Sequence, residues 1–271
     1  MNNSNWLGWR FENGLWREER SVSMADRGFR YGMSLFETVA IRNGKALFLE
    51  PHLSRLFSSA QKVDWSIPES WRQDIACFFL SEKWSDGVVR IFITAGEGSP
   101  LDAPTGFNLY VMWEDVPFPD QNAIARGIKV SLVKSKGLPF AGLKTGNYWS
   151  PVQTLQEARK GGADEALIFD ADDSLISAAM ANVFVYLNDK WITPSLASGA
   201  RDGVVRDWIL RRSDAVERNV RLDEIKAVEE IILMNSRIGI MPVSAVDGVV
   251  ISERSRSLHL AEEYLNTVIN A

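Results

Sequence analysis

The chain has 271 residues, of which 46% are hydrophobic and 24% are charged, enough apolar material for one large or two small domains. Its net charge of -5 at pH 7 lacks the basic excess of nucleic-acid-binding proteins. A single cysteine excludes a disulfide framework or a cysteine-rich metal site within one chain, and no apolar stretch is long enough for a membrane span, so we expect a cytoplasmic protein.

The first elements along the chain are predicted to be strands. Residues 7–18 and 35–49 each contain an Asn-Gly pair between short apolar runs, which is typical of a β-hairpin. Apolar side chains at helical spacing then predict two helices, over residues 51–62 and 69–83. Further strands are expected before the middle of the chain.

A proline-rich polar segment divides the chain. It predicts an interdomain linker at residues 116–122 between a small N-terminal α/β domain, residues 1–115, and a larger C-terminal domain, residues 123–271. Strands and helices, among them helices at residues 150–160 and 204–212, follow one another without a regular βαβα order. This pattern argues against a Rossmann domain or a TIM barrel and favours a mixed α and β (α+β) fold.

The sequence lacks the patterns of a hydrolytic triad and of a dinucleotide-binding site. The two histidines, His52 and His259, lie on predicted helices and neither is near a nucleophile-elbow sequence, which argues against a hydrolytic triad. Gly96 and Gly98 lack the third glycine of a dinucleotide-binding fingerprint.

One lysine is distinguished by its surroundings. Lys144 follows an apolar stretch, residues 138–143, and precedes the helix predicted at residues 150–160. Partial removal from water lowers the pKa of an amine, which is the property that a Schiff-base nucleophile requires. A lysine in a loop is ordinarily a solvated surface group, as Lys134 illustrates, so the residue type alone leaves both interpretations open.

Other segments have the form of a phosphate site. Residues 198–203 form a loop that enters a predicted helix, where free backbone amides attract phosphate, although a plain loop-helix junction has the same pattern. Asn235 and Ser236 lie in a predicted turn that could supply further donors. Arg55 is a single arginine on a predicted helix, where most arginines are surface residues.

Several segments occur together in an order and approximate spacing that resemble one enzyme family. They are Asp26-Arg-Gly-Phe-Arg-Tyr31-Gly-Met-Ser-Leu-Phe36-Glu-Thr38, His52-Leu-Ser-Arg55-Leu, Lys144-Thr-Gly-Asn-Tyr148, Ala163-Asp-Glu-Ala, Ala181-Asn-Val-Phe184 and Asp202-Gly-Val-Val-Arg-Asp207. The chain resembles the class IV aminotransferase family, the fold type IV pyridoxal-phosphate enzymes that include branched-chain and D-amino-acid aminotransferases and 4-amino-4-deoxychorismate lyase. The resemblance implies a two-domain fold with mixed sheets, pyridoxal 5'-phosphate as cofactor, a small-molecule amino substrate and a homodimer.

The resemblance also implies roles for single residues. Lys144 is the implied Schiff-base lysine and proton shuttle, Arg55 holds the cofactor phosphate, and Tyr148 neighbours the phenolic oxygen of the cofactor. Thr38 matches a lyase position proposed to assist proton transfer. Tyr31 is a candidate substrate contact.

The implied phosphate cradle comes from the second half of the chain. Val204 and Val205 offer backbone amides, and Asn235 and Ser236 complete the cradle. The run that begins at Asn235 resembles the lyase branch more than the threonine-rich version of the transaminases.

Two departures from the family pattern concern the chemistry. Ser177 stands where the family has a glutamate that pairs with the pyridine nitrogen, and serine offers only a neutral hydrogen bond, so we expect a weaker electron sink. Residues 93–96 replace a stretch in which lyases and D-amino-acid enzymes often carry an arginine for the substrate carboxylate.

Three hypotheses follow. In a lyase, the substrate amine displaces Lys144 and forms an external aldimine, the freed lysine removes the adjacent proton, and elimination releases pyruvate and leaves p-aminobenzoate. Formation of the aromatic ring supplies driving force, which makes a weak sink more tolerable. A branched-chain or D-amino-acid aminotransferase is the alternative. Ser177 would impair this reaction more, because transamination must stabilise a carbanion without help from the formation of an aromatic ring. The third hypothesis is a cofactor-binding protein without turnover.

Overall fold

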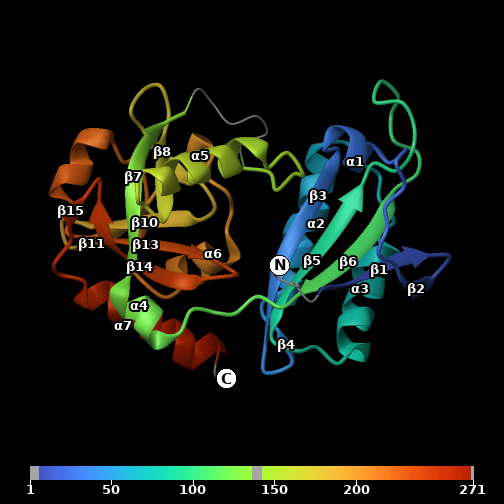
Figure 1. Cartoon of the computed structure of the whole chain (residues 1–271), viewed down its shortest axis with the longest axis horizontal. Coiled ribbons are helices and arrows are strands. Elements are labelled where there is room, and N and C mark those ends of the chain that lie inside the picture. The colour runs from blue at the N-terminus through green and yellow to red at the C-terminus, as the bar shows by residue number, and fades with distance from the viewer. Residues whose placement is uncertain (1–5, 136–141, 270–271) are drawn as a thin grey trace. The chain divides into compact units, whose positions relative to one another are not determined.

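The computed structural model describes residues 6–135 and 142–269 and divides the chain into two compact units (Figure 1). Unit 1 comprises Met1–Pro117 with Leu143–Asn147, and unit 2 comprises Phe118–Gly142 with Tyr148–Ala271. Among the residues described, no helix has the length and apolar character needed to cross a membrane.

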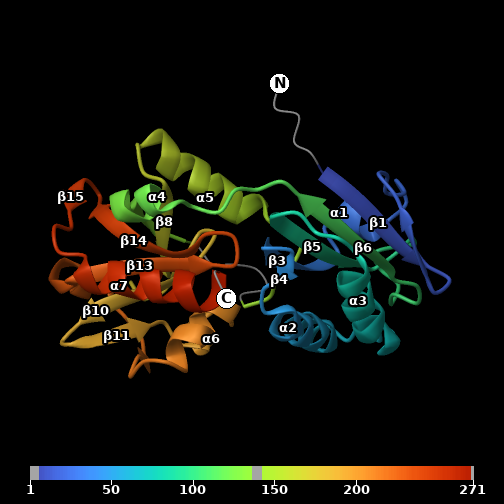
Figure 2. The ribbon, with the colours of Figure 1, turned by 90° about the horizontal axis from the view of Figure 1, so that it is seen from below.

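Unit 1 is built on an antiparallel sheet of six strands in the order β2-β1-β6-β5-β3-β4. The strands are β1 (Trp6–Glu12), β2 (Leu15–Glu18), β3 (Ser34–Arg42), β4 (Lys45–Ala46), β5 (Gly87–Thr94) and β6 (Asn108–Glu114). The helices are α1 (Arg27–Tyr31), α2 (Leu49–Lys62) and α3 (Ser70–Ser81). Figure 2 shows α2 and α3 on the same side of the sheet.

Two Asn-Gly turns fold the first strands of unit 1. Asn13 and Gly14 have φ angles of 53° and 79°, and Asn43 and Gly44 have φ angles of 52° and 72°. Positive φ at both central residues gives the tight turn that matches the twist of the flanking strands. β1 therefore pairs with β2 and β3 pairs with β4, which confirms both predicted hairpins.

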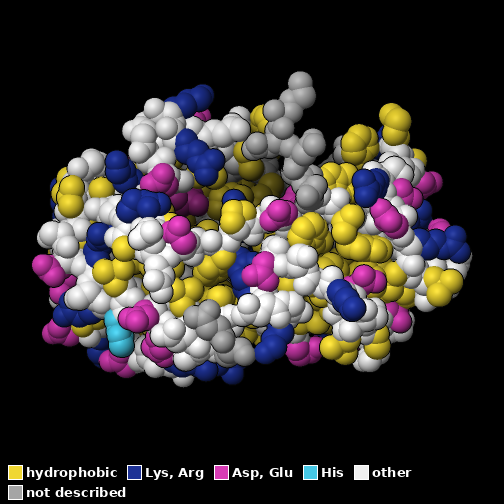
Figure 3. Space-filling model, turned by 60° about the horizontal axis from the view of Figure 1, so that its bottom comes forward, with side chains coloured by type: hydrophobic (Ala, Val, Ile, Leu, Met, Phe, Trp, Pro, Cys, Tyr) yellow, Lys and Arg dark blue, Asp and Glu magenta, His cyan; other side chains and the backbone are white. Residues whose placement is uncertain are grey.

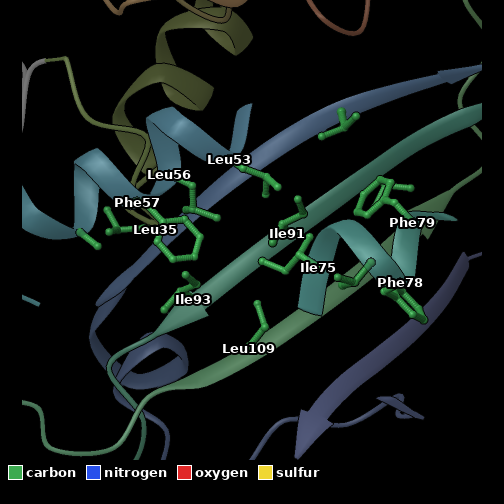
Figure 4. Packing of buried hydrophobic residues seen from close by; sticks show 14 of the residues in the cluster. Leu35, Leu53, Leu56, Phe57, Ile75, Phe78, Phe79, Ile91, Ile93 and Leu109 are labelled. Carbon is green, nitrogen blue, oxygen red and sulfur yellow. The ribbon is translucent and has the colours of Figure 1, made fainter. Parts of the chain in front are cut away.

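The core of unit 1 lies between the sheet and its two longer helices (Figure 4). Leu53 and Leu56 on α2 are buried and belong to the same cluster as Leu35 on β3 and Ile91 on β5. Full burial of one such side chain contributes about 1.5–3 kcal/mol. This packing fixes α2 against β3, so that polar side chains on the facing sides of both elements also come together.

Unit 2 contains a mixed sheet of nine strands in the order β12-β11-β10-β13-β14-β7-β8-β9, with β15 paired to β14. The strands are β7 (Ile128–Lys134), β8 (Glu165–Phe169), β9 (Leu175–Ala178), β10 (Asn182–Leu187), β11 (Lys190–Thr193), β12 (Val216–Glu217), β13 (Glu230–Asn235), β14 (Gly239–Val246) and β15 (Val249–Val250). The helices are α4 (Gln121–Arg126), α5 (Trp149–Lys160), α6 (Val204–Leu210) and α7 (Ser255–Tyr264), with short helical turns η1 (Leu196–Ser198), η2 (Leu222–Ala227) and η3 (Leu265–Ile269). β7 runs parallel to β14 and β8, whereas most other neighbours are antiparallel, so the predicted mixed α and β fold is confirmed.

The helices predicted from the sequence over the ranges given above are all present. Those expected over residues 51–62, 69–83, 150–160 and 204–212 correspond to α2, α3, α5 and α6, with ends that differ by at most two residues. The short helices α1 and α4 are not predicted from the sequence, because five or six residues are too few to show helical spacing.

Leu143–Asn147 packs with unit 1, whereas the sequence places Lys144 in the C-terminal domain. Sheet hydrogen bonds cause this difference, because the amide of Phe36 donates to the carbonyl of Lys144 at 2.9 Å and the amide of Gly146 donates to the carbonyl of Ser34 at 2.8 Å. β4 pairs with only the last two residues of β3. The segment Leu143–Asn147 therefore pairs with the first part of β3, which β4 leaves uncovered. Of the apolar stretch predicted before Lys144, residues 138–141 lie outside the described residues.

Candidate functional site

The side chain of Lys144 lies over an aromatic ring of unit 1. Its Nζ atom is 3.9 Å from the centroid of Phe36, and that ring stacks on Phe92 of β5 at 5.4 Å. Phe36 is buried and Lys144 is half-buried. An ammonium group over the face of an aromatic ring is attracted by its quadrupole, and the ring also shields the amine from water on that side. Lys144 is therefore a partly desolvated, positioned amine.

A buried carboxylate on the next residue of β3 holds two side chains of α2. Glu37 Oε1 accepts a hydrogen bond from Arg55 Nε at 2.7 Å, and Glu37 Oε2 accepts one from Arg55 Nη2 at 2.6 Å. His52 Nδ1 lies 2.8 Å from the same Oε2. The side chains of Glu37 and His52 are each 1% exposed, and that of Arg55 is 15% exposed. The bidentate pair commits two of the five N–H donors of Arg55 and fixes the plane of its guanidinium group.

Local structure brings these three side chains together. His52 and Arg55 are three residues apart on α2, a spacing that places them on one face of the helix. Strand alternation turns Glu37 to the same side as Leu35, which packs against α2. We therefore treat Glu37, His52 and Arg55 as one cluster, the Glu37 cluster.

The Glu37 cluster shifts the pKa of its members. Burial favours a raised pKa for Glu37, but the positive charge and hydrogen bonds of Arg55, with the hydrogen bond of His52, hold its pKa far below the ordinary value. Burial lowers the pKa of His52, the charges of Arg55 and Lys144 lower it further, and Glu37 acts in the opposite direction. Glu37 is thus ionised, and His52 is neutral with its Nδ1 proton donated to Glu37.

Neither Glu37 nor His52 is assigned a role from the sequence. The available signals are a single acidic residue within a strand whose side chains are otherwise mostly apolar, and a histidine three residues before Arg55 on the apolar stripe of a helix. Both signals indicate a buried polar contact, because an acidic residue is rarely buried without a partner.

Thr38 and Tyr31 are also in unit 1. Thr38 is half-buried on β3 and alternates to the same side of the strand as Phe36, with Arg90 opposite it on β5. Tyr31 ends α1, is 40% exposed, and has the guanidinium of Arg30 4.8 Å from its ring centroid. Gly32 follows with φ of 68°, which a glycine adopts without strain.

Unit 2 contains Tyr148, one of several residues that the resemblance places beside the cofactor. Tyr148 is half-buried immediately before α5, and its hydroxyl accepts a hydrogen bond from Nη1 of Arg201 at 3.1 Å. Arg201 lies in the loop before α6 and is not singled out from the sequence, because one arginine in a polar loop has no distinguishing spacing.

The start of α6 is held close to β10. Nδ2 of Asn182 donates to the carbonyl of Arg201 at 2.8 Å, and a Cβ atom on Gly203 would overlap the side chain of Asn182. The side chains of Val204 and Val205 are buried, so these two residues can offer a ligand only their backbone amides, as predicted for a phosphate cradle.

The side chain of Asn235 stabilises the turn that follows β13. Its Oδ1 accepts from the amides of Arg237 and Ile238 at 2.9 and 3.0 Å, and its Nδ2 donates to the carbonyl of Met180 at 2.9 Å. Asn235 therefore shapes the turn that contains Ser236. The bond to Met180 also joins this turn to the connection between β9 and β10.

The predicted residues of unit 2 gather at one end of its sheet. Ser177 is half-buried on β9, near the connection that Asn235 holds, and Asn182 at the start of β10 pairs with Met234. Asn182 in turn holds the loop of Arg201. Within unit 1, Lys144 is hydrogen-bonded to Phe36 and Arg55 is hydrogen-bonded to Glu37, which are adjacent residues of β3.

Comparison with known proteins identifies the family. A family model described as amino-transferase class IV matches residues 34–246. The chain is 26% identical over 262 residues to the branched-chain-amino-acid aminotransferase of Pseudomonas aeruginosa, covering 86% of this chain and 82% of that protein. It is 22% identical over 254 residues to the D-alanine aminotransferase of Listeria monocytogenes, covering 89% and 87%. The solved structure of 4-amino-4-deoxychorismate lyase from Pseudomonas aeruginosa matches with a TM-score of 0.79 and 27% identity, covering 97% of this chain and 100% of that chain.

The matched region spans most of the chain, so the protein belongs to the amino-transferase class IV family and has the fold type IV architecture. It is an enzyme of the pyridoxal-phosphate-dependent lyase or aminotransferase kind, and its relatives include both. The resemblance drawn from the sequence motifs is confirmed.

Proposed function

We propose that this protein binds pyridoxal 5'-phosphate through Lys144 and eliminates pyruvate from 4-amino-4-deoxychorismate to give p-aminobenzoate. One observation carries the cofactor part of this proposal. Phe36 on β3 holds the backbone of Lys144, and the next residue, Glu37, holds the guanidinium of Arg55. An aldehyde that carries a phosphate requires an amine and an anion-binding group. One strand holds the segments of both, and the charges of Lys144 and Arg55 both act on His52.

The charges of unit 1 fit such a cofactor. The positive charges of Arg55 and Lys144 both act on His52, which is neutral, and positive side chains of this kind attract the phosphate of such a cofactor. When bound, pyridoxal phosphate supplies a conjugated ring that takes up the electron pair left on the substrate carbon. Lys144 would hold the aldehyde of the cofactor, and its amine would take the proton beside the substrate nitrogen.

Residues of unit 2 complete the proposed set. Tyr148 is assigned to the phenolic oxygen, and the amides of Val204 and Val205 to the phosphate. Ser236 adds a hydroxyl, and Asn235 contributes by shaping the turn that presents it. Thr38 and Tyr31 remain candidates for proton transfer and substrate contact in unit 1.

Ser177 favours elimination over amino transfer. A serine hydroxyl offers the pyridine nitrogen only a neutral hydrogen bond, so Ser177 stabilises negative charge on the ring less than a carboxylate partner would. Elimination that creates an aromatic product has an additional driving force. The 27% identity to the Pseudomonas aeruginosa lyase over 97% of this chain also supports this subtype.

Amino transfer is the second candidate. The matches to a branched-chain-amino-acid aminotransferase and to a D-alanine aminotransferase each cover more than four fifths of this chain. In that reaction Lys144 would return the proton to the cofactor side of the bond rather than support the loss of pyruvate.

The two candidates can be separated directly. Purified protein with pyridoxal phosphate is incubated with aminodeoxychorismate, and separately with a panel of L- and D-amino acids plus a 2-oxo acid. We expect p-aminobenzoate and pyruvate from the first reaction, and Lys144→Ala should abolish both products. Lys134→Ala is the matched control, because the side chain of Lys134 is 60% exposed and pairs with Asp173. Amino transfer without p-aminobenzoate would overturn the lyase assignment, and no product from either reaction would favour a cofactor-binding protein without turnover.

We also propose a homodimer. Unit 1 exposes large apolar side chains, among them Met24, Phe29 and Leu101, which are 81%, 66% and 93% exposed. Figure 3 shows hydrophobic side chains exposed among charged ones on the unit 1 side, at the right. A second copy could cover such surface and remove it from water. Light scattering should give twice the chain mass of 30.4 kDa, and a species of the single mass would refute the dimer.

A further inference from the structure

Arg201 is a half-buried cation attached to a residue of the proposed site. Its Nη1 donates to the hydroxyl of Tyr148 at 3.1 Å, and its guanidinium carbon lies 5.9 Å from the centroid of the same ring. The ring and its hydroxyl thus define the direction in which the guanidinium points. Both contacts lie within unit 2.

The backbone that carries Arg201 is held in place. Asn182 donates to the carbonyl of Arg201 at 2.8 Å, and the close approach of Gly203 to Asn182 leaves no room for a Cβ atom. The loop before α6 is therefore fixed to β10 on both sides of Asp202. A side chain on such a loop can be positioned for a ligand without a large ordering cost.

Arg201 differs from Arg206 and Arg218 of unit 2 in its charge balance. It differs in its partners from Arg254, which likewise has no ion pair among the described residues, because Nη1 of Arg254 donates to two backbone carbonyls. Arg206 pairs with Glu217, and Arg218 pairs with Glu224. Over residues 6–135 and 142–269, no ion pair joins Arg201 to a carboxylate, and its buried Nε atom has no hydrogen-bond partner. The Nε atom of Arg206 is also unpartnered, but the charge of that side chain is compensated. A cation taken partly out of water without a counter-ion is costly, and an anionic ligand would remove that cost.

The chemistry of a guanidinium selects the class of anion. Its two Nη atoms form a planar fork that matches the two oxygens of a carboxylate. Amino acids and aminodeoxychorismate all carry a carboxylate.

We propose that Arg201 binds the carboxylate of the amino substrate, with Tyr148 orienting its guanidinium group. This assignment rests on the proposed function and names the group that selects carboxylate-bearing substrates. It gives Tyr148 a second role, because the same hydroxyl that is assigned to the cofactor also fixes the arginine.

The test compares a carboxylate with its neutral amide. Calorimetry on the holoprotein measures the Kd of 4-aminobenzoate and of propionate, each beside 4-aminobenzamide and propionamide. Arg201→Leu should weaken both carboxylates about ten- to a hundredfold, the range for loss of charge-assisted hydrogen bonds, and change the amides less than about twofold. Arg201→Lys keeps the charge without the fork and should fall between the wild type and Arg201→Leu.

Arg211→Leu is the matched control. Arg211 follows α6, its side chain is 73% exposed and it pairs with Asp207, so its loss should leave all four affinities unchanged. Carboxylate affinities that survive in Arg201→Leu would overturn the proposal. An equal loss of affinity for the carboxylates and the amides in Arg201→Leu would also overturn it. So would a wild-type protein that binds neither carboxylate.

Cofactor uptake separates this inference from the function on which it rests. Absorbance of bound pyridoxal phosphate and borohydride labelling of Lys144 are measured on the same preparations. If the wild type takes up the cofactor and Arg201→Leu keeps its carboxylate affinity, only the role of Arg201 fails. If the wild type takes up no cofactor at Lys144, the proposed function fails.

Discussion

Glu37→Gln removes the negative charge that holds Arg55 while keeping the size of the side chain. Glu37 is 1% exposed and accepts hydrogen bonds from two nitrogens of Arg55 and from His52. Breaking a buried pair by removing one partner leaves the other charge uncompensated, and this costs about 3–5 kcal/mol. In a chain of this size, about 1 kcal/mol shifts the melting temperature by about 2–4 °C, so we expect a decrease of about 6–20 °C.

Thermal unfolding of the apoprotein at pH 7, followed by circular dichroism, measures this change. The stabilisation by Glu37 is fully present above its ordinary pKa of 4.5 and declines as the pH falls below that value toward the lowered pKa of the fold, so pH 7 shows the whole effect. Glu50→Gln on α2 is the control. Its side chain is 65% exposed and pairs with Arg72, and such a surface pair contributes at most about 1 kcal/mol. A shift in Glu37→Gln no larger than that in Glu50→Gln would refute the reasoning.

Three further changes test other parts of the structure. His52 is neutral in the fold, so the unfolded chain binds one more proton below the ordinary pKa of 6.5 and stability falls as the pH falls through that value. His52→Gln should flatten the dependence of the unfolding free energy on pH below about pH 6.5, by up to about 1.4 kcal/mol per pH unit. An unchanged slope in urea titrations would contradict this. Gly32→Ala places a Cβ on a residue with φ of 68° and against the side chain of Asn147. We therefore expect the unfolding free energy to fall by about 1–2 kcal/mol in the same assay. An unfolding free energy equal to that of the wild type would contradict this. Ser177→Glu should raise amino transfer relative to pyruvate release when both products are quantified, and a constant or lower ratio would count against the weak-sink argument.

Local chemistry made part of the fold predictable. The Asn-Gly pairs specify tight turns because both residues tolerate positive φ, and the long helix α2 shows its apolar face directly in the sequence. The placement of Lys144 was not predictable in this way. Its segment joins unit 1 through backbone hydrogen bonds to β3, and backbone pairing between distant segments leaves no periodic signal.

Some residues of the candidate site could also be found from the sequence, and others could not. Lys144 and Arg55 were recognisable through the order of several motifs along the chain. Glu37 and Arg201 were not, because their roles depend on partners 15 or more residues away, His52 for the first and Tyr148 for the second. Tertiary contacts, not local spacing, bring these charged residues beside their partners.

Covalent labelling tests the central claim most directly. Purified protein is mixed with pyridoxal 5'-phosphate, reduced with borohydride, digested and mapped by mass spectrometry. We predict a yellow holoprotein whose absorption is lost on reduction, with the pyridoxyl group on Lys144, and no stable label in Lys144→Ala. A pyridoxyl group on another lysine in the wild type, or equal labelling in Lys144→Ala, would contradict the assignment.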